Sequence, residues 1–265
     1  MKTGISWFSI PADLSTKEKF ELVKRAAYDG VELRTVRSEA ELLELKAEAD
    51  KAGLETPSFI ETIHWKSPLS SSDPVARRNT REIFESNLEY AARIGSNTVL
   101  CIPGVMSQDT SYREVYDTAL NEIRILAKVA ARVKVTLAIE NVWNRFLLSP
   151  LEFVGFLDEV NSPYVRAYFD CGNICLYGYP QDWIRVLGRT RIAKIHVKGF
   201  LDYPHTIGFP KSLISDVPWR RIMETLQEIG CQDYLTVEIK AEGKEAAEKV
   251  FQYSEELSRI IEGKL

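Results

Sequence analysis

The feature that most limits the fold of this chain is a regular alternation of short apolar segments with longer amphipathic ones. Each apolar run typical of a strand is followed by a segment typical of a helix, and eight such pairs occur in 265 residues. This alternation predicts βαβ units with right-handed crossovers and therefore a parallel sheet. The predicted strands span 2–7, 31–33, 54–60, 97–102, 135–140, 164–170, 192–197 and 234–239. The predicted helices span 16–28, 38–52, 73–94, 112–132, 181–187, 218–228 and 242–261, with one more opening at Ser149-Pro150.

Eight strand–helix units favour a closed barrel, which typically needs about 250 residues. We therefore expect an α/β fold, a (β/α)₈ TIM barrel that forms a single domain over residues 1–265. An open doubly wound sheet is the alternative. It usually carries a Gly-rich phosphate loop after the first strand, where this chain has Trp7-Phe8-Ser9-Ile10-Pro11. The longest predicted loops cover 61–73, 171–179 and 199–217.

Composition argues against several classes of partner. The formal net charge is −4, and no basic run suggests nucleic acid. The N-terminus lacks the apolar core of a signal peptide, and no apolar run approaches the ~18 residues of a membrane span. The four cysteines form no C-x-x-C pair, which favours free thiols in a reducing cytoplasm. Zinc binding by Cys171 and Cys175 is the alternative.

Four side chains with metal-binding groups close the last four predicted strands. They are Glu140, Asp170, His196 and Glu238. In a barrel of this type the active site lies at the C-terminal ends of the strands, so we expect these groups to meet around one divalent cation. Taken singly, each is explained by a helix cap, a surface pair or a core histidine. Three carboxylates and one imidazole favour Mn²⁺, with Co²⁺, Mg²⁺ or Zn²⁺ as alternatives.

Charged and aromatic residues surround the predicted barrel mouth. Lys198 shares strand parity with His196, and Lys240 with Glu238. These lysines either bind an anionic group of the substrate or are solvated residues at the rim of the barrel. Predicted loops on the same side carry residues that either cover a substrate or simply pack the loops: Trp7, His64, Trp65, Trp143 and Arg145. Lys66, Arg145, Lys198 and Lys240 are either phosphate partners or ordinary surface residues, and Glu152 is expected to cap a helix or to form a pair.

The strand-end motifs resemble the xylose-isomerase-like TIM-barrel superfamily. The motifs are Ile139-Glu140-Asn141, Phe169-Asp170-Cys171-Gly172-Asn173, Lys194-Ile195-His196-Val197-Lys198 and Val237-Glu238-Ile239. Asp216-Val217-Pro218-Trp219, 64–69 and 149–153 are also similar to segments of this superfamily. The likeness is strongest to its sugar (phosphate) isomerase/epimerase branch, with ketose 3-epimerases and hexulose-6-phosphate isomerase-type proteins. Asn173 departs from that branch, because many ketose 3-epimerases carry histidine there.

The resemblance implies metal-dependent 3-epimerisation of a ketose or ketose phosphate through a cis-enediolate. Glu140 and Glu238 would be the two acid/base residues and, with Asp170 and His196, the metal ligands. His64, Lys66, Trp143, Asn173 and Lys198 are the substrate-binding candidates. A dehydratase of a keto-sugar or cyclitol is the alternative activity, and a sugar-binding barrel without catalysis is a second. An apurinic-site endonuclease, which uses three zinc ions and more histidines, does not fit three histidines.

The resemblance places the chain in cytoplasmic carbohydrate metabolism, with a small-molecule sugar or sugar phosphate as its partner. A homodimer or homotetramer is compatible with it. Neither the phosphorylation state of the substrate nor the oligomer follows from the residues.

Overall fold

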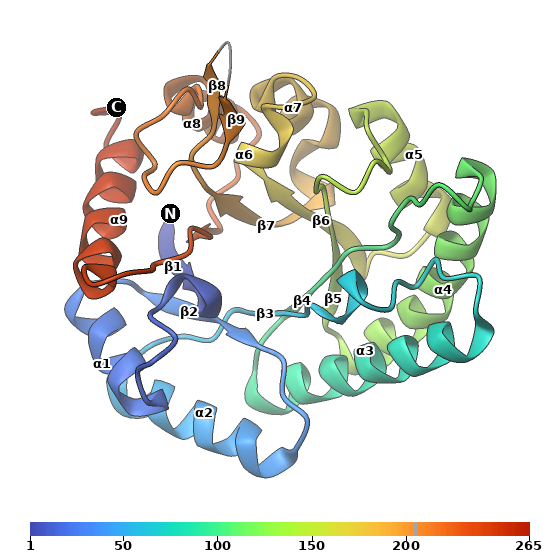
Figure 1. Cartoon of the computed structure of the whole chain (residues 1–265), viewed down its shortest axis with the longest axis horizontal. Coiled ribbons are helices and arrows are strands. Elements are labelled where there is room, and N and C mark those ends of the chain that lie inside the picture. The colour runs from blue at the N-terminus through green and yellow to red at the C-terminus, as the bar shows by residue number, and fades with distance from the viewer. Residues whose placement is uncertain (204–205) are drawn as a thin grey trace.

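Parallel strands close into a barrel in the computed structural model, which describes residues 1–203 and 206–265 (Figure 1). The order around the barrel is β1-β10-β7-β6-β5-β4-β3-β2, and each neighbouring pair is parallel. This confirms the predicted TIM barrel. The barrel strands are β1 (Lys2–Ser6), β2 (Gly30–Arg34), β3 (Ser58–Ile60), β4 (Thr98–Cys101), β5 (Thr136–Glu140), β6 (Val165–Asp170), β7 (Ile192–Val197) and β10 (Tyr234–Val237).

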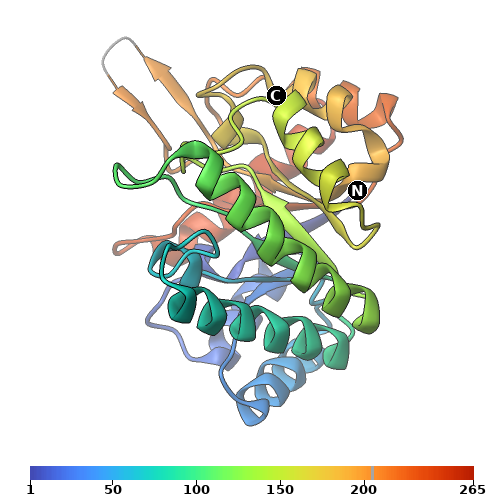
Figure 2. The same ribbon diagram turned by 90° about the vertical axis from the view of Figure 1, so that its right-hand side faces the viewer.

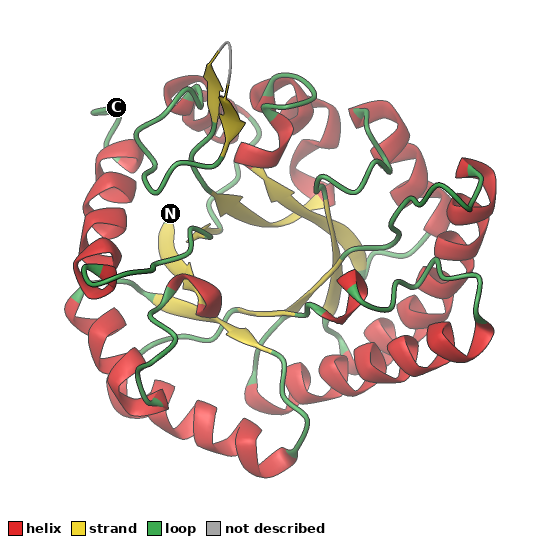
Figure 3. Cartoon of the chain, viewed as in Figure 1, coloured by secondary structure: helices red, strands yellow, loops and turns green. Residues whose placement is uncertain are grey.

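Helices surround the strands on the outside (Figure 3). Several begin at residues whose side chains satisfy free backbone N–H groups: Ser15 and Ser111 form capping boxes with Glu18 and Glu114, and Ser149 accepts from Glu152. Within the described ranges, no helix is long and apolar enough to cross a membrane. The α-helices are α1 (Thr16–Arg25), α2 (Glu39–Ala52), α3 (Pro74–Ile94), α4 (Tyr112–Val133), α5 (Pro150–Val160), α6 (Cys171–Ile174), α7 (Pro180–Arg191), α8 (Trp219–Glu228) and α9 (Ala246–Ile261); η1 (Trp7–Ser9) and η2 (Ile63–Trp65) are 3₁₀ helices.

Two segments predicted to be loops contain regular structure. Residues 171–174 form α6, because the side chain of Asp170 accepts a hydrogen bond from the Asn173 N–H and caps the turn. The predicted loop 199–217 holds an antiparallel hairpin of β8 (Leu201–Tyr203) and β9 (Thr206–Gly208). Residues 204–205 of that loop lie outside the described ranges. Figure 2 shows the hairpin projecting from one end of the barrel.

The side chains of the barrel interior and those of its outer surface pack into separate apolar clusters. The larger cluster lies between strands and helices and includes Ile139, Phe169 and Ile195. The smaller one contains residues of the opposite strand parity, among them Ala138 and Tyr168, and therefore fills the barrel. Glu140 and Asp170 share the parity of Ala138 and Tyr168, so β5 and β6 direct them into the barrel mouth.

The cysteines agree with the expectation of free thiols. All four are free, and Cys101, Cys171 and Cys231 are buried. The thiol of Cys175 donates to the backbone oxygen of Cys171. The pair therefore has an ordinary structural contact, and neither thiol lies in the metal-binding cluster found in the described part of the chain.

Candidate metal centre and active site

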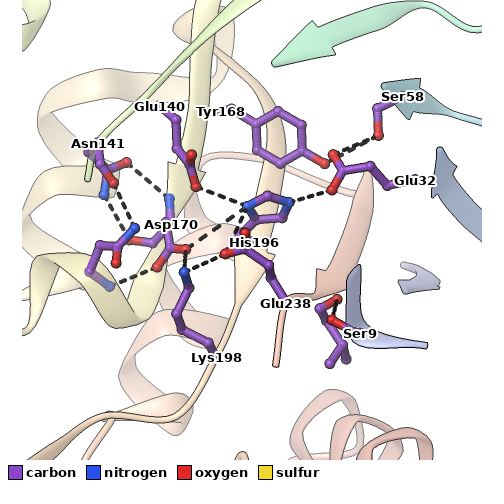
Figure 4. Close-up of polar contacts among 12 residues, drawn as sticks. Ser9, Glu32, Ser58, Glu140, Asn141, Tyr168, Asp170, His196, Lys198 and Glu238 are labelled. Carbon is purple, nitrogen blue, oxygen red and sulfur yellow. Dashed lines mark hydrogen bonds and ion pairs between the residues drawn. The ribbon is translucent and has the colours of Figure 1, made fainter. Parts of the chain in front are cut away.

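The structure brings together the four strand-end residues predicted to bind a metal ion. Glu140, Asp170, His196 and Glu238 each offer one ligand atom, and these atoms lie within 4.8 Å of one another (Figure 4). His196 Nδ1 lies at the centre of the cluster, 3.0 Å from Glu140 Oε1, 3.7 Å from Glu238 Oε2 and 4.0 Å from Asp170 Oδ2. The cluster could hold one metal ion.

Strand register and two asparagines fix the geometry of this cluster. Asp170 of β6 is the direct partner of His196 on β7. Asn141, which follows β5, accepts from the Asp170 backbone N–H at 3.0 Å and donates to its carbonyl at 2.9 Å. Asn173 donates in turn to the carbonyl of Asn141 at 2.9 Å. The ends of β5 and β6 are thus joined by side-chain bonds beside Glu140 and Asp170.

Glu32 is a buried member of the cluster that the strand-end pattern does not reveal. Its Oε2 lies 2.9 Å from His196 Nε2, so His196 presents Nδ1 to the carboxylates and Nε2 to Glu32. Ser58 donates to the other Glu32 oxygen at 3.2 Å, and its hydroxyl lies 3.3 Å from that of Tyr168. A carboxylate that accepts from the second nitrogen of a ligating histidine fixes the ring and its tautomer. Its position in a short apolar strand, with interior parity, is the signal that could have revealed it.

The charges and donor atoms of the cluster fit a divalent cation. Glu32, Glu140, Asp170 and Glu238 contribute four carboxylates, and Lys198 contributes one ammonium that pairs with Asp170 at 2.9 Å and with Glu238. A histidine that ligates a metal is neutral, and the four carboxylates and one ammonium then leave a net charge of −3 in a buried site, which is costly without a bound cation. Asp170 Oδ2 and Glu238 Oε2, the two buried oxygens that face the cluster, share this single ammonium as their cationic partner. Mixed oxygen and nitrogen donors of this kind suit several divalent metals.

The two glutamates that face each other in the cluster differ in electrostatic environment. Burial raises the pKa of Glu140 to about 7, although the hydrogen bond with His196 opposes this shift. Burial acts on Glu238 in the same direction, but Lys198 and His196 outweigh it and hold the pKa of Glu238 below its usual value. Opposite shifts in two neighbouring carboxyls are typical of an acid and base pair.

A cavity of about 330 Å³ opens beside the cluster. Glu140 and Glu238 reach it, and four of the predicted substrate-binding residues, His64, Trp143, Asn173 and Lys198, line it. The fifth, Lys66, is exposed and is not among the described residues that line the cavity. The nitrogen of the Trp143 indole donates to the Asn173 carbonyl at 3.0 Å, so the site has an aromatic wall held by α6, the helical turn that follows Asp170.

His64 reaches the cavity from η2, a segment organised by the buried carboxylate of Glu61. Burial lowers the pKa of His64 to about 4, so the imidazole is neutral near pH 7. Its Nδ1 is buried and has no hydrogen-bond partner among the described residues. Glu61 is 1% exposed. It accepts from the side chains of Thr35, Arg37 and Asn87 and from the N–H groups of Thr62 and Ile63.

The remaining residues that were predicted from the loops differ in where the structure places them. Trp7 is buried against Phe20 and does not line the cavity. Arg145 is exposed, whereas Trp65 lines the cavity while remaining half exposed. Glu152 accepts from the Leu148 N–H and from the Tyr112 hydroxyl, as expected for a cap.

The closed barrel carries at its mouth a cluster of side chains that could hold a metal ion, and comparison with known proteins identifies the family. A family model described as Xylose isomerase-like TIM barrel matches residues 20–260, and the chain belongs to this family. UlaE of Salmonella typhimurium, an L-ribulose-5-phosphate 3-epimerase, is 26% identical over 252 residues, which cover 88% of this chain and 85% of UlaE. SgbU of Haemophilus influenzae, a putative L-ribulose-5-phosphate 3-epimerase, is 24% identical over 244 residues, with coverage of 88% and 82%.

A solved structure of an L-ribulose 3-epimerase has the same fold. Its TM-score is 0.83 at 15% identity, with coverage of 99% of this chain and 95% of that one. The names of the relatives confirm the assignment of the chain to the isomerase class, as the resemblance of the strand-end motifs indicates.

Proposed function

We propose that the chain is a divalent-metal-dependent 3-epimerase of a ketose or ketose phosphate. The observation that carries the proposal is that the carboxylates of Glu140 and Glu238 reach one cavity from strands that are not neighbours. β6 and β7 separate β5 from β10, so the two carboxylates approach a bound sugar from different directions. The 3-epimerase names of the relatives support the same reaction.

Inversion at C3 of a ketose requires a base on one face of the substrate and an acid on the other. One glutamate accepts the C3 proton, and the electron pair of the C–H bond moves toward the carbonyl to give an enediolate. The other glutamate returns a proton to the opposite face, which restores the carbonyl with inverted configuration. Positioned acid/base groups of this kind contribute about 10²–10⁴ each to the rate.

Glu140, Asp170, His196 and Glu238 would hold the cation, with Mn²⁺ favoured. When bound, it would supply positive charge to the oxygens of the enediolate. Glu32 orients the His196 ring, and Lys198 offsets charge on Asp170 and Glu238. Trp143 stacks on Phe209 with ring centroids 4.4 Å apart, and this aromatic pair limits water access to the cavity.

Proton NMR in deuterated water tests the reaction. Purified protein with Mn²⁺ is incubated with L-ribulose 5-phosphate and, separately, with L-ribulose. We expect the C3 epimer, with one C–H exchanged for deuterium and no loss of water. A product that has lost a hydroxyl group would instead identify a dehydratase, and sugar binding without any exchange would identify a binding protein.

A homodimer or homotetramer and a cytoplasmic location stay predictions, and we propose that residues 1–265 form one domain.

A further inference from the structure

We infer that the substrate carries a phosphate, and that Lys211 and Lys240 bind it in a second cavity that adjoins the first. This inference rests on the proposed function and names its substrate class. The second cavity has a volume of about 300 Å³. Phe8, Lys198, Phe209 and Glu238 line both cavities, so the two adjoin at the Glu238 carboxylate. A substrate held at Glu238 can therefore extend from one into the other.

Positive charge is unequally divided between the two cavities. Among the described residues that line the first, Lys198 is the one lysine or arginine, and it is already paired with Asp170 and Glu238. Much of the remaining wall is apolar or aromatic. The second cavity adds Lys211 and Lys240. An anionic group at one end of a sugar is therefore stabilised in the second cavity and repelled by the carboxylates of the first.

Glu242 holds the two added ammonium groups together. Lys211 Nζ lies 3.3 Å from Glu242 Oε2, and Lys240 pairs with the other oxygen of the same carboxylate. The two lysines come from different loops, one after β9 and one after β10. Two ammonium groups on one carboxylate leave a net positive charge, and lysine binds phosphate as a compact point charge with several donors.

Ser9 fixes this subsite relative to the reacting carbon. Its hydroxyl donates to the Val237 carbonyl at 3.3 Å and accepts from the Ile239 N–H at 2.9 Å (Figure 4). These bonds hold the backbone on both sides of Glu238. Lys240 lies two residues further along and lines the same cavity as Glu238. The spacing between the acid/base carboxylate and the anion-binding lysine is therefore set by a backbone segment held at two points.

The test compares phosphorylated and free substrate in matched variants. Wild type, Lys211→Ala, Lys240→Ala and the double variant are assayed with L-ribulose 5-phosphate and L-ribulose. We expect kcat/KM for the phosphorylated substrate to fall about tenfold or more per lysine and to fall steeply with added salt. For free L-ribulose it should stay within about twofold. Lys244→Ala is the control, because Lys244 is exposed on the same loop and is not among the residues lining either cavity.

Calorimetric binding of inorganic phosphate gives a second measurement that does not depend on turnover. Wild type should bind phosphate, the double variant should bind it at least tenfold more weakly, and Lys244→Ala should match wild type. Equal losses on both substrates, or unchanged phosphate affinity in the double variant, would overturn the subsite while leaving epimerisation intact. If wild type epimerises neither substrate, the proposed function fails, and the phosphate titration alone decides on the subsite.

Discussion

Glu32 Oε2 lies 2.9 Å from His196 Nε2, and both side chains are fully buried. This contact directs the other imidazole nitrogen toward Glu140, Asp170 and Glu238. Loss of a carboxylate that supports a metal-bound histidine typically lowers metal affinity by about 10–100-fold. We therefore expect Glu32→Gln to weaken Mn²⁺ or Co²⁺ binding by this amount in a calorimetric titration. Glu44→Gln on the exposed face of α2 is the control, and an equal effect of both changes would contradict a specific role of Glu32.

Replacement of either acid/base candidate should remove nearly all turnover. In Glu140→Gln and Glu238→Gln the amide cannot exchange a proton, so we expect kcat to fall by about 10²–10⁴. Turnover is measured together with metal content by elemental analysis, because both residues are also candidate ligands. Most of the activity remaining in either folded variant would refute the assignment.

Metal removal should lower thermal stability as well as activity. A ligand that binds only the folded state at 100 times its Kd stabilises it by about 2.7 kcal/mol. We expect chelator treatment to lower the Tm by several degrees, and Mn²⁺ to restore it. His196→Ala should lose the metal content and this metal-dependent shift. A shift of the same size in His196→Ala would show that the ion binds elsewhere.

Glu61 should make stability depend on pH in the acid range. Burial tends to raise the pKa of this carboxyl, but Arg37 and the other donors outweigh burial, so its pKa lies below the ordinary 4.5. A lowered pKa in the folded state contributes stability that is complete above about pH 4.5 and is lost as the pH falls through the folded value. Glu61→Gln should therefore cost about 2–4 kcal/mol at pH 7.

Urea unfolding at pH 7 and at pH 3.5 measures this contribution. The difference between wild type and Glu61→Gln should be smaller at the lower pH. Glu82→Gln, an exposed change on α3, should show little effect at either pH. A difference that grows as the pH falls would mean that Glu61 is not stabilising as a carboxylate.

The barrel and the four ligand candidates follow from the sequence because two local patterns indicate them. Alternating strands and helices indicate the topology, and a polar residue at the end of an apolar strand marks the barrel mouth. Asp170 and His196, far apart in the chain, become direct partners through strand register alone. That step requires no knowledge of side-chain packing.

Lys211 and the hairpin β8–β9 depend on three-dimensional contacts that local patterns do not contain, and the role of Glu32 depends on a partner from a distant strand. Glu32 lies within a strand, and its importance appears only when β7 places His196 opposite it. Lys211 lies in a long segment without periodicity, and its proximity to Lys240 results from their shared partner Glu242. Lys66 is the opposite case. Its position in the sequence predicts a substrate contact, but it is not among the described residues that line the cavity.

The pairing of β1 with β10 would make a bound ion a reporter of chain completion. Glu238 follows β10, the strand that closes the barrel by pairing with β1. The hydroxyl of Ser9, near the N-terminus, forms hydrogen bonds with the backbone on both sides of Glu238. A nascent or truncated chain that stops before residue 234 lacks both the strand that closes the barrel and the candidate ligand Glu238. Ion retention would therefore distinguish finished molecules from fragments, even fragments that have already formed most of their helices.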